Sequence, residues 1–265
     1  MLEIIHIAKT FNPGTITEKK ALVDVHLHLQ PGDFCTVIGG NGAGKSTMLN
    51  AVAGTYFVDK GKILIDGENV TRLPEHKRAA YLGRVFQDPM NGTAATMSIE
   101  DNLALAMRRG KTRTPRWGIT NTERKLYRDK LATLGLGLED RMSSRVGLLS
   151  GGQRQALTLL MATLQKPKLL LLDEHTAALD PKTAEKVLDA TERIVAKDNL
   201  TTVMITHNMR DAIAHGNRLI MMYDGKILID VSGEEKKNLT VEQLLALCSK
   251  ASGSDEADDK LLLSR

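Results

Sequence analysis

Two segments near the start of the chain, residues 2–7 and 23–29, largely alternate between apolar and polar side chains. This alternation is typical of strands that bury one face, and it predicts an antiparallel β-subdomain at the N-terminus. In the second segment Asp24, His26 and His28 share the polar face. These side chains could form a metal site, but histidines on a solvated strand face need no ligand, so we favour the solvated face.

Three later segments, residues 34–38, 169–172 and 202–205, are apolar runs that lack this alternation. Such runs are typical of parallel strands buried on both faces. Helical patterns separate them, and in one of these Asp180 and Pro181 mark a helix start. Strands that alternate with helices predict an α/β fold with a mostly parallel sheet as its core.

Two further helix starts are marked by a hydroxyl residue with an acidic residue three positions later. They are Ser98 with Asp101 and Thr120 with Glu123, and both fit the capping pattern of helix N-termini. We therefore expect an inserted α-helical subdomain at about residues 88–165. The domain as a whole is expected to span residues 1–250. Residues 251–265 form an acidic tail, rich in small residues, that we expect to be flexible.

Composition narrows the class of protein. The chain has 265 residues, of which 42% are hydrophobic, enough for one large domain. No stretch has the ~18 uninterrupted apolar residues of a membrane helix, and the N-terminus lacks the plan of a signal peptide. The net charge of +4 is modest, and no nucleic-acid partner is expected. The two cysteines, Cys35 and Cys248, lack ligand spacing and are interpreted as buried apolar residues.

A basic run covers residues 108–113, with Arg116 and Trp117 just beyond. It suits either a patch for nucleic acid or lipid headgroups or a solvated connection between two helices, and we favour the connection.

The stretch after the first apolar run fits the phosphate-loop pattern G-x-x-x-x-G-K-[ST]. Glycines there let backbone N–H groups approach phosphate oxygens, and the following helix adds its positive N-terminus. A Gly-rich surface turn is the alternative, but the strand before and the helix after favour the phosphate loop. Lys45 is expected to reach the β- and γ-phosphates and Ser46 to ligate Mg²⁺. The residues expected to contact nucleotide are Gly39, Gly40, Asn41, Gly42, Ala43, Gly44, Lys45, Ser46 and Thr47.

The polar residues for hydrolysis are expected at the same edge of the sheet, because carboxyl ends of parallel strands meet there. Asp173 and Glu174 follow the leucine strand. We expect Asp173 to hold Mg²⁺ and Glu174 to polarise the attacking water. His207 follows the next strand and could donate to the γ-phosphate, and Gln87 could ligate Mg²⁺ or position the water.

A second candidate anion site is the segment Leu149-Ser150-Gly151-Gly152-Gln153-Arg154-Gln155, which precedes an apolar helix expected from Ala156 to Leu164. A serine and two glycines at a helix start can bind an anion. Together with the phosphate loop, Gln87, Asp173-Glu174, Ala178-Leu179-Asp180 and His207, this segment makes the chain resemble the nucleotide-binding subunit of an ATP-binding cassette (ABC) transporter. The match covers nearly the whole chain to about Ile229. The expected fold class is therefore an α/β P-loop NTPase core with an N-terminal antiparallel β-subdomain and an inserted helical subdomain.

The resemblance implies a head-to-tail dimer. Residues Ser150, Gly151, Gly152 and Gln153 of one copy, with Asp180, would contact the ATP held by the other. It also implies that Phe11 stacks on adenine, where tyrosine is more usual in the family. Two departures are Gly40 and His175, which stand where proline is frequent.

The resemblance further implies an ATPase that powers separate transmembrane permease subunits from the cytoplasmic face of the inner membrane. Import of a small solute such as an amino acid is the favoured direction, with a separate substrate-binding protein. The alternatives are a soluble ABC-type ATPase acting on nucleic acid or ribosomes, and a motor of the lipid or exporter type.

Overall fold

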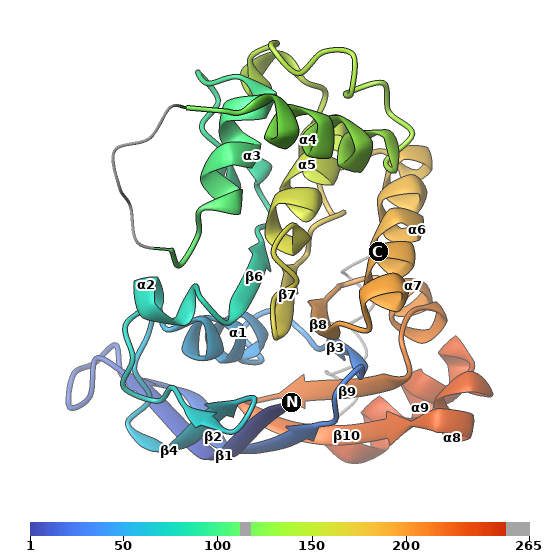
Figure 1. Cartoon of the computed structure of the whole chain (residues 1–265). Coiled ribbons are helices and arrows are strands. Elements are labelled where there is room, and N and C mark those ends of the chain that lie inside the picture. Colours follow the sequence, from blue (N-terminus) through green and yellow to red (C-terminus); the bar gives the residue numbers. More distant parts are fainter. Residues whose placement is uncertain (112–117, 253–265) are drawn as a thin grey trace.

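The computed structural model describes residues 1–111 and 118–252. They form one antiparallel sheet of four strands, in the order β2-β1-β4-β5, and one mostly parallel sheet of six strands, in the order β10-β9-β3-β8-β7-β6. Figure 1 shows β1, β2 and β4 at the bottom of the molecule and α3, α4 and α5 together at the top. The expected α/β fold with an N-terminal antiparallel sheet and a mostly parallel core is confirmed.

The antiparallel sheet consists of β1 (Leu2–Phe11), β2 (Lys19–Leu29), β4 (Lys60–Ile65) and β5 (Glu68–Asn69). The first two strands are longer than predicted, because irregularities in their register break the alternation. At these points His6 and Asp24 have left-handed φ angles of 47° and 56°. The alternation restarts beyond each irregularity, so the sequence pattern identifies only part of each strand.

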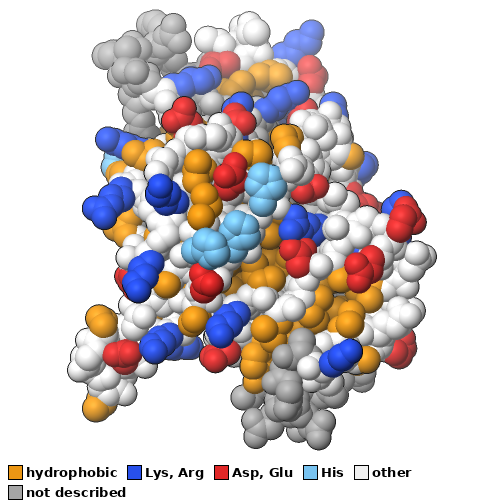
Figure 2. All heavy atoms as spheres, turned by 90° about the horizontal axis from the view of Figure 1, so that it is seen from below, with side chains coloured by type: hydrophobic (Ala, Val, Ile, Leu, Met, Phe, Trp, Pro, Cys, Tyr) orange, Lys and Arg blue, Asp and Glu red, His pale blue; other side chains and the backbone are white. Residues whose placement is uncertain are grey.

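The outer face of this sheet carries the histidines. His6 Nδ1 lies 2.8 Å from Asp24 Oδ1, and the rings of His6 and His26 stack with centroids 5.1 Å apart. Figure 2 shows histidine side chains gathered near the middle of the face seen from below. Within the described residues, no group of three or more His, Cys, Asp and Glu side chains could hold a metal ion. The polar face carries exposed side chains that contact one another.

The six-stranded sheet is the core that carries the site. Its parallel strands pair as β9-β3-β8-β7-β6, and β10 joins β9 as an antiparallel hairpin. All five residues of β3 and of β8 are buried, as their mostly apolar sequences without alternation predict. The strands are β3 (Phe34–Ile38), β6 (Leu82–Val85), β7 (Leu169–Asp173), β8 (Thr201–Ile205), β9 (Arg218–Tyr223) and β10 (Lys226–Ser232).

Helix α1 (Lys45–Ala53) follows β3 and is held at its C-terminal end by a buried arginine. Arg78 is fully buried, and its guanidinium donates to the carbonyls of Ala51 and Val52 at 2.6 and 2.9 Å and, through Nε, to Leu73 O. A cation that satisfies the last carbonyls of a helix stabilises its end. This contact fixes the helix whose other end forms the phosphate loop.

The chain has further helices outside the antiparallel sheet. They are α2 (Glu75–Arg78), α6 (Pro181–Asp198), α7 (Met209–Ala214), α8 (Gly233–Lys237) and α9 (Val241–Ser252), with 3-10 turns η1 (Pro89–Gly92) and η2 (Val146–Leu148). Asp180 caps α6 by accepting from Thr183 N at 3.1 Å, which confirms the predicted helix start.

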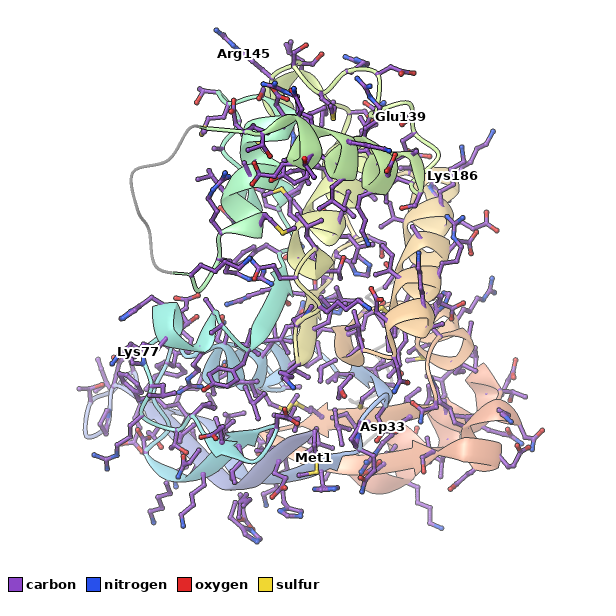
Figure 3. All side chains as sticks on the ribbon, in the orientation of Figure 1. Met1, Asp33, Lys77, Glu139, Arg145 and Lys186 are labelled. Atoms are coloured by element: carbon purple, nitrogen blue, oxygen red, sulfur yellow. The ribbon has the colours of Figure 1, made fainter. Side chains whose placement is uncertain are left out.

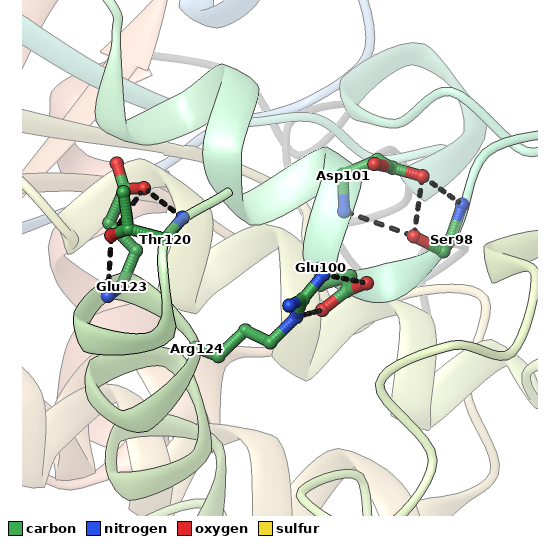
Figure 4. A network of polar contacts seen from close by, with 6 residues as sticks. All are labelled: Ser98, Glu100, Asp101, Thr120, Glu123 and Arg124. Atoms are coloured by element: carbon green, nitrogen blue, oxygen red, sulfur yellow. Dashed lines mark hydrogen bonds and ion pairs between the residues drawn. The ribbon is translucent and has the colours of Figure 1, made fainter. Parts of the chain in front are cut away.

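Helices α3 (Ile99–Met107), α4 (Asn121–Ala132) and α5 (Gly151–Thr163) share an apolar cluster of their own. The helix starts predicted at Ser98 and Thr120 are confirmed, since each hydroxyl forms a capping box with the acidic residue three positions on. Figure 4 shows both boxes and the ion pair between Arg124 and Glu100, 2.9 Å long, that joins α4 to α3.

The start predicted for α5, at Ala156, is wrong by five residues. The helix begins at Gly151, because Ser150 and Gln153 form a capping box ahead of the apolar segment. Two consecutive glycines have low helix propensity, so the sequence pattern alone suggests a later start. The glycines therefore lie in the first turn of the helix.

One end of the molecule is formed by helices α3, α4 and α5, and the other by the antiparallel sheet (Figure 1). Figure 3 shows Arg145, Glu139 and Lys186 towards one end and Met1 and Asp33 towards the other. None of the described helices is both long and apolar enough to cross a bilayer.

Cys35 and Cys248 are both buried, as predicted.

Two predictions concern residues that the structure does not describe. Most of the acidic tail predicted over 251–265 lies outside the described residues, as do residues 112–117 of the basic segment.

Candidate functional site

The phosphate loop lies between β3 and α1 and depends on glycine at two positions. Gly39 has φ 146°, and a Cβ there would lie 2.2 Å from the carbonyl oxygen of Met222. Gly44 has φ 102°, and a Cβ there would lie 2.6 Å from Ala21 O. Backbone atoms of the protein leave no room for a side chain at either position. Only glycine therefore allows this loop conformation, which lets backbone N–H groups approach a ligand.

The N-terminus of α1 is open. Gly44 is its N-cap residue and supplies no side-chain hydrogen bond, so the first N–H groups of the helix have no side-chain acceptor. Lys45 is only 5% exposed, and its Nζ donates to Gly39 O at 2.7 Å and to Gly40 O at 3.1 Å. Uncapped N–H groups, a helix dipole and a lysine held over the loop together form an anion site of the size of a phosphate.

Glu174 and His207 meet at the carboxyl edge of the parallel sheet. Glu174 directly follows β7, and His207 comes two residues after β8. Their side chains form a contact of 2.6 Å between Nε2 and Oε1. Burial lowers the pKa of Lys45, while the charges of Glu174 and Asp173 act in the opposite direction. The structure thus brings Glu174 and His207 into contact at this edge, and the charge of Glu174 acts on Lys45 of the phosphate loop.

Asp173 ends β7 and is largely shielded from solvent. Burial raises the pKa of its carboxyl, and Arg84, whose Nη2 lies 3.7 Å from Oδ2, acts to lower it. The nearby Arg84 guanidinium therefore offsets part of the effect of burial on the pKa of Asp173.

Ser46 and Gln87 are exposed, and neither side chain has a hydrogen-bond partner among the described residues. With Asp173 they provide a hydroxyl, an amide oxygen and a carboxylate. Mg²⁺ prefers hard oxygen donors such as these. It is usually bound by only one or two carboxylates, and phosphates and water complete its shell. The residues present therefore fit the ion, although no contact joins Gln87 directly to Asp173.

The second candidate anion site lies at the N-terminus of α5. Gln153 N donates to Ser150 Oγ at 3.3 Å, and Ser150 N donates back to Gln153 Oε1 at 3.2 Å. Gly152 packs against α6, where a Cβ would lie 2.0 Å from Thr183 Cγ2, while Gly151 is exposed. The structure thus brings the residues predicted around 150–153 close to Asp180 and α6. No hydrogen bond within the described residues joins them to the phosphate loop.

Phe11 ends β1 and is half-exposed. Its ring meets the edge of the Tyr56 ring at 5.2 Å, and Lys9 Nζ lies 5.7 Å from its centroid. Tyr56 is 38% exposed, and the planes of the two rings are nearly perpendicular. No sequence pattern predicts this aromatic pair, because the two residues are 45 positions apart.

His175 is buried in the turn after β7, directly after Glu174. Thr191 Oγ1 donates to Val187 O at 2.8 Å, so His175 Nε2 donates to that hydroxyl at 3.2 Å. Burial lowers the pKa of His175 to about 4. Glu174 itself has φ 46°, a left-handed angle. A hydrogen bond to Thr191 of α6 thus anchors the turn at the position where proline is frequent in the family.

A cleft of about 1140 Å³ borders Glu174 and His207 and extends between α6, α7 and α9. Its lining includes Glu185 and Asp211, and burial raises the pKa of Asp211. The cleft therefore lies beside the strand-end residues, on the side of α6.

Comparison with known proteins gives a consistent result. A family model described as ABC transporter matches residues 22–177. The tyrosine transport ATP-binding protein of Clostridioides difficile (strain R20291) is 42% identical over 250 residues, which cover 92% of this chain and 97% of that protein. The spermidine/putrescine import ATP-binding protein PotA of Shigella flexneri serotype 5b (strain 8401) is 33% identical over 232 residues. The match covers 86% of this chain but only 58% of that longer protein.

A solved structure also matches in fold. It is the dimeric structure of a post-hydrolysis state of the ATP-binding cassette MJ0796 bound to ADP and Pi, with a TM-score of 0.75 and 28% sequence identity. The match covers 88% of this chain and 98% of that one.

Proposed function

Because this chain belongs to the ABC transporter family, as an ATP-binding subunit with ATPase activity, we propose that it powers the import of a small solute through a separate membrane permease. The observation that carries this proposal is the contact between Glu174 and His207 at the edge of the sheet where Lys45 is held over the phosphate loop. A phosphate-binding lysine beside a carboxylate paired with a histidine has the parts that phosphoryl transfer to water requires.

Glu174 is proposed to polarise the attacking water. One of its carboxylate oxygens is engaged by His207 at 2.6 Å, which leaves the second oxygen to accept a hydrogen bond from water. His207 fixes the orientation of the carboxylate and can donate to a γ-phosphate oxygen. Lys45 would stabilise the charge on the β- and γ-phosphates.

Ser46, Gln87 and Asp173 are the residues proposed to hold Mg²⁺. When bound, the ion would neutralise charge on the phosphate oxygens. Phe11 is proposed to stack on adenine with Tyr56 beside it, and residues 39–47 to wrap the phosphates. These roles rest on the positions of the side chains described above.

The N-terminus of α5 is proposed to bind the nucleotide of a second copy. The Ser150 hydroxyl accepts from Gln153 N, but its own proton remains available to a phosphate oxygen. Gly151 and Gly152 would add backbone N–H groups, with Gln153 and Asp180 nearby. A head-to-tail dimer with ATP between the copies uses this site, and the matched cassette structure is dimeric.

The permease is proposed to dock beside Gln87, where Met90 and Met97 are 42% and 37% exposed. The named relatives serve tyrosine and polyamine transport, which supports a small, nitrogen-containing solute such as an amino acid as the cargo. We further propose a separate substrate-binding protein and a location on the cytoplasmic face of the inner membrane. Residues 1–250 would form one domain, with its helical part at about 88–165.

The proposal is tested with Glu174→Gln, which keeps the shape of the side chain and removes its charge. We expect ATP binding to persist and hydrolysis to fall at least 100-fold, because the amide cannot polarise water. Glu185→Gln is the matched control, since Glu185 lines the same cleft on α6 without ending a strand. Measurements are ATP affinity and phosphate release in the assembled complex with its permease.

Near-normal hydrolysis by Glu174→Gln would reject the assigned role. Equal losses of hydrolysis in Glu174→Gln and Glu185→Gln would mean that negative charge in the cleft matters, and not the position of Glu174 at the end of β7.

A further inference from the structure

Arg84 lies on the edge strand β6, which pairs with β7, the strand that ends at Asp173. Its Nη2 donates to Asn50 Oδ1 of α1 at 2.6 Å and lies 3.7 Å from Asp173 Oδ2. The side chain is only 14% exposed. A guanidinium in this place connects the carboxylate proposed for Mg²⁺ to the helix behind the phosphate loop.

The same guanidinium also contacts the segment that leads to Gln87. Its Cζ lies 4.5 Å from the centroid of the Phe86 ring, within cation–π distance. Phe86 O accepts from Gln155 Nε2 of α5 at 3.1 Å. One side chain therefore contacts both the end of β7 and the backbone segment that places Gln87.

The arrangement is not that of an arginine locked into one ion pair. Asp173 at 3.7 Å and Glu75 at 3.9 Å are both farther than a bidentate pair would be, and Nε is buried without a hydrogen-bond partner among the described residues. Burial lowers the pKa of Arg84, but an arginine stays charged in proteins. The flat, forked group is suited to contact several partners at once, which a lysine cannot do.

We propose that Arg84 is a positioning residue that holds Asp173 and the Phe86–Gln87 segment in one arrangement, so that both sets of oxygen donors face the same Mg²⁺. The inference rests on the proposed function. It predicts that Arg84 supports the part of ATP affinity that Mg²⁺ adds, and not the part that the phosphate loop provides alone.

Arg84→Lys tests this directly, because it keeps the positive charge and removes the fork and the flat stacking surface. The measured quantity is the Mg²⁺ enhancement, defined as the ratio of ATP dissociation constants in EDTA and in Mg²⁺, obtained with a fluorescent ATP analogue and the full chain. We expect the enhancement to fall about 3- to 10-fold, and affinity in EDTA to stay within about twofold of the unmodified chain.

Arg109→Lys is the matched control. Arg109 is another shielded arginine, its Nη2 donates to Ala162 O at 3.0 Å, and burial lowers its pKa. It contacts none of the proposed site residues, so its substitution should leave the enhancement unchanged. Phe86→Leu is the second variant: it removes the stacking partner, keeps Arg84, and should reduce the enhancement about 2- to 3-fold.

The possible outcomes separate the two proposals. An unmodified chain without any Mg²⁺ enhancement would reject the proposed Mg²⁺ site itself. A normal Mg²⁺ enhancement in Arg84→Lys would overturn the positioning role alone. Equal losses of ATP affinity with and without Mg²⁺ would also overturn it, because they indicate a general structural role. Should Arg84→Lys fail to fold, a normal enhancement in Phe86→Leu overturns the role and a reduced one supports it.

Discussion

The two helix N-termini that carry the candidate anion sites are built differently. The first turn of α1 has no side-chain cap, and its N-cap residue Gly44 takes a left-handed angle. The first turn of α5 is capped reciprocally by Ser150 and Gln153. One site leaves its N–H groups available, and the other satisfies part of its own.

This difference indicates an order of binding. An uncapped helix start with a buried lysine costs stability unless an anion is present, so the phosphate loop is prepared for a ligand. A capped start is stable alone and offers only the remaining N–H groups and the Ser150 proton. The phosphate loop should therefore bind nucleotide in a single copy, and the α5 site should act only once a second copy presents its nucleotide.

Lys45→Ala should have the largest effect. It removes a charge-assisted contact to phosphate, so ATP affinity of the single copy should fall about 10- to 100-fold. Ser150→Ala should leave that affinity within about twofold, because the α5 site is proposed to bind the nucleotide of a second copy. Nucleotide titration at protein concentrations that keep the chain monomeric measures both. Similar losses in the two variants would contradict the assigned order.

Gly152→Ala should come next, with a loss of about 1–3 kcal/mol in the free energy of unfolding. Its Cβ would lie 2.0 Å from Thr183 Cγ2. Thr183→Ser removes that methyl group and keeps the hydroxyl, so the double variant should regain most of the loss. Gly151→Ala, whose Cβ would lie 3.4 Å from Leu179, is the control. Urea unfolding gives the values, and a double variant as unstable as Gly152→Ala would disprove the packing explanation.

A third test concerns His175 in the turn after Glu174, between β7 and α6. The unfolded chain protonates His175 near pH 6.5, whereas the folded chain does so only at about 4. Stability therefore falls as pH drops through this window, and His175 should contribute a loss of about 2 kcal/mol between pH 7 and pH 5. His175→Gln lacks this titration, so its stability should decline less steeply than that of the unmodified chain. Thermal unfolding from pH 7 to 5 compares the slopes; parallel slopes would argue against a buried neutral histidine.

The smallest effect is expected from loss of the α5 cap. Ser150→Ala and Thr120→Ala each remove the hydroxyl of a capping box, so each should cost about 1 kcal/mol of stability. Only Ser150→Ala should also weaken ATP-dependent dimerisation, measured by light scattering in the Glu174→Gln background. If Thr120→Ala weakens the dimer equally, the Ser150 site acts through stability and not through contact.

The sequence predicts best where a local rule decides the structure. β3 has the predicted bounds because a mostly apolar run of five residues fills one strand that is buried throughout. The capping boxes at Ser98 and Thr120 have the predicted members, since residues three positions apart meet in the first turn. The meeting of Glu174 and His207 follows from parallel strands ending at one edge.

The sequence fails where contacts depend on distant parts of the chain. Arg84 has no local pattern that distinguishes it from a solvated residue of an edge strand, and its partners lie on α1 and β7. The irregularities at His6 and Asp24 require left-handed angles that non-glycine residues rarely adopt. The anchor of His175 on Thr191 exists only because α6 packs behind the turn.

The burial of both thiols has a practical consequence for labelling experiments. Burial raises the pKa of Cys35 to about 12, and Cys248 is fully buried in α9. Neither offers an accessible thiolate to a maleimide probe in the native chain. A cysteine introduced at Leu148, which is 73% exposed just before Ser150, could therefore carry a fluorophore without any change to the native thiols. Its signal would report the arrival of a second copy at the N-terminus of α5.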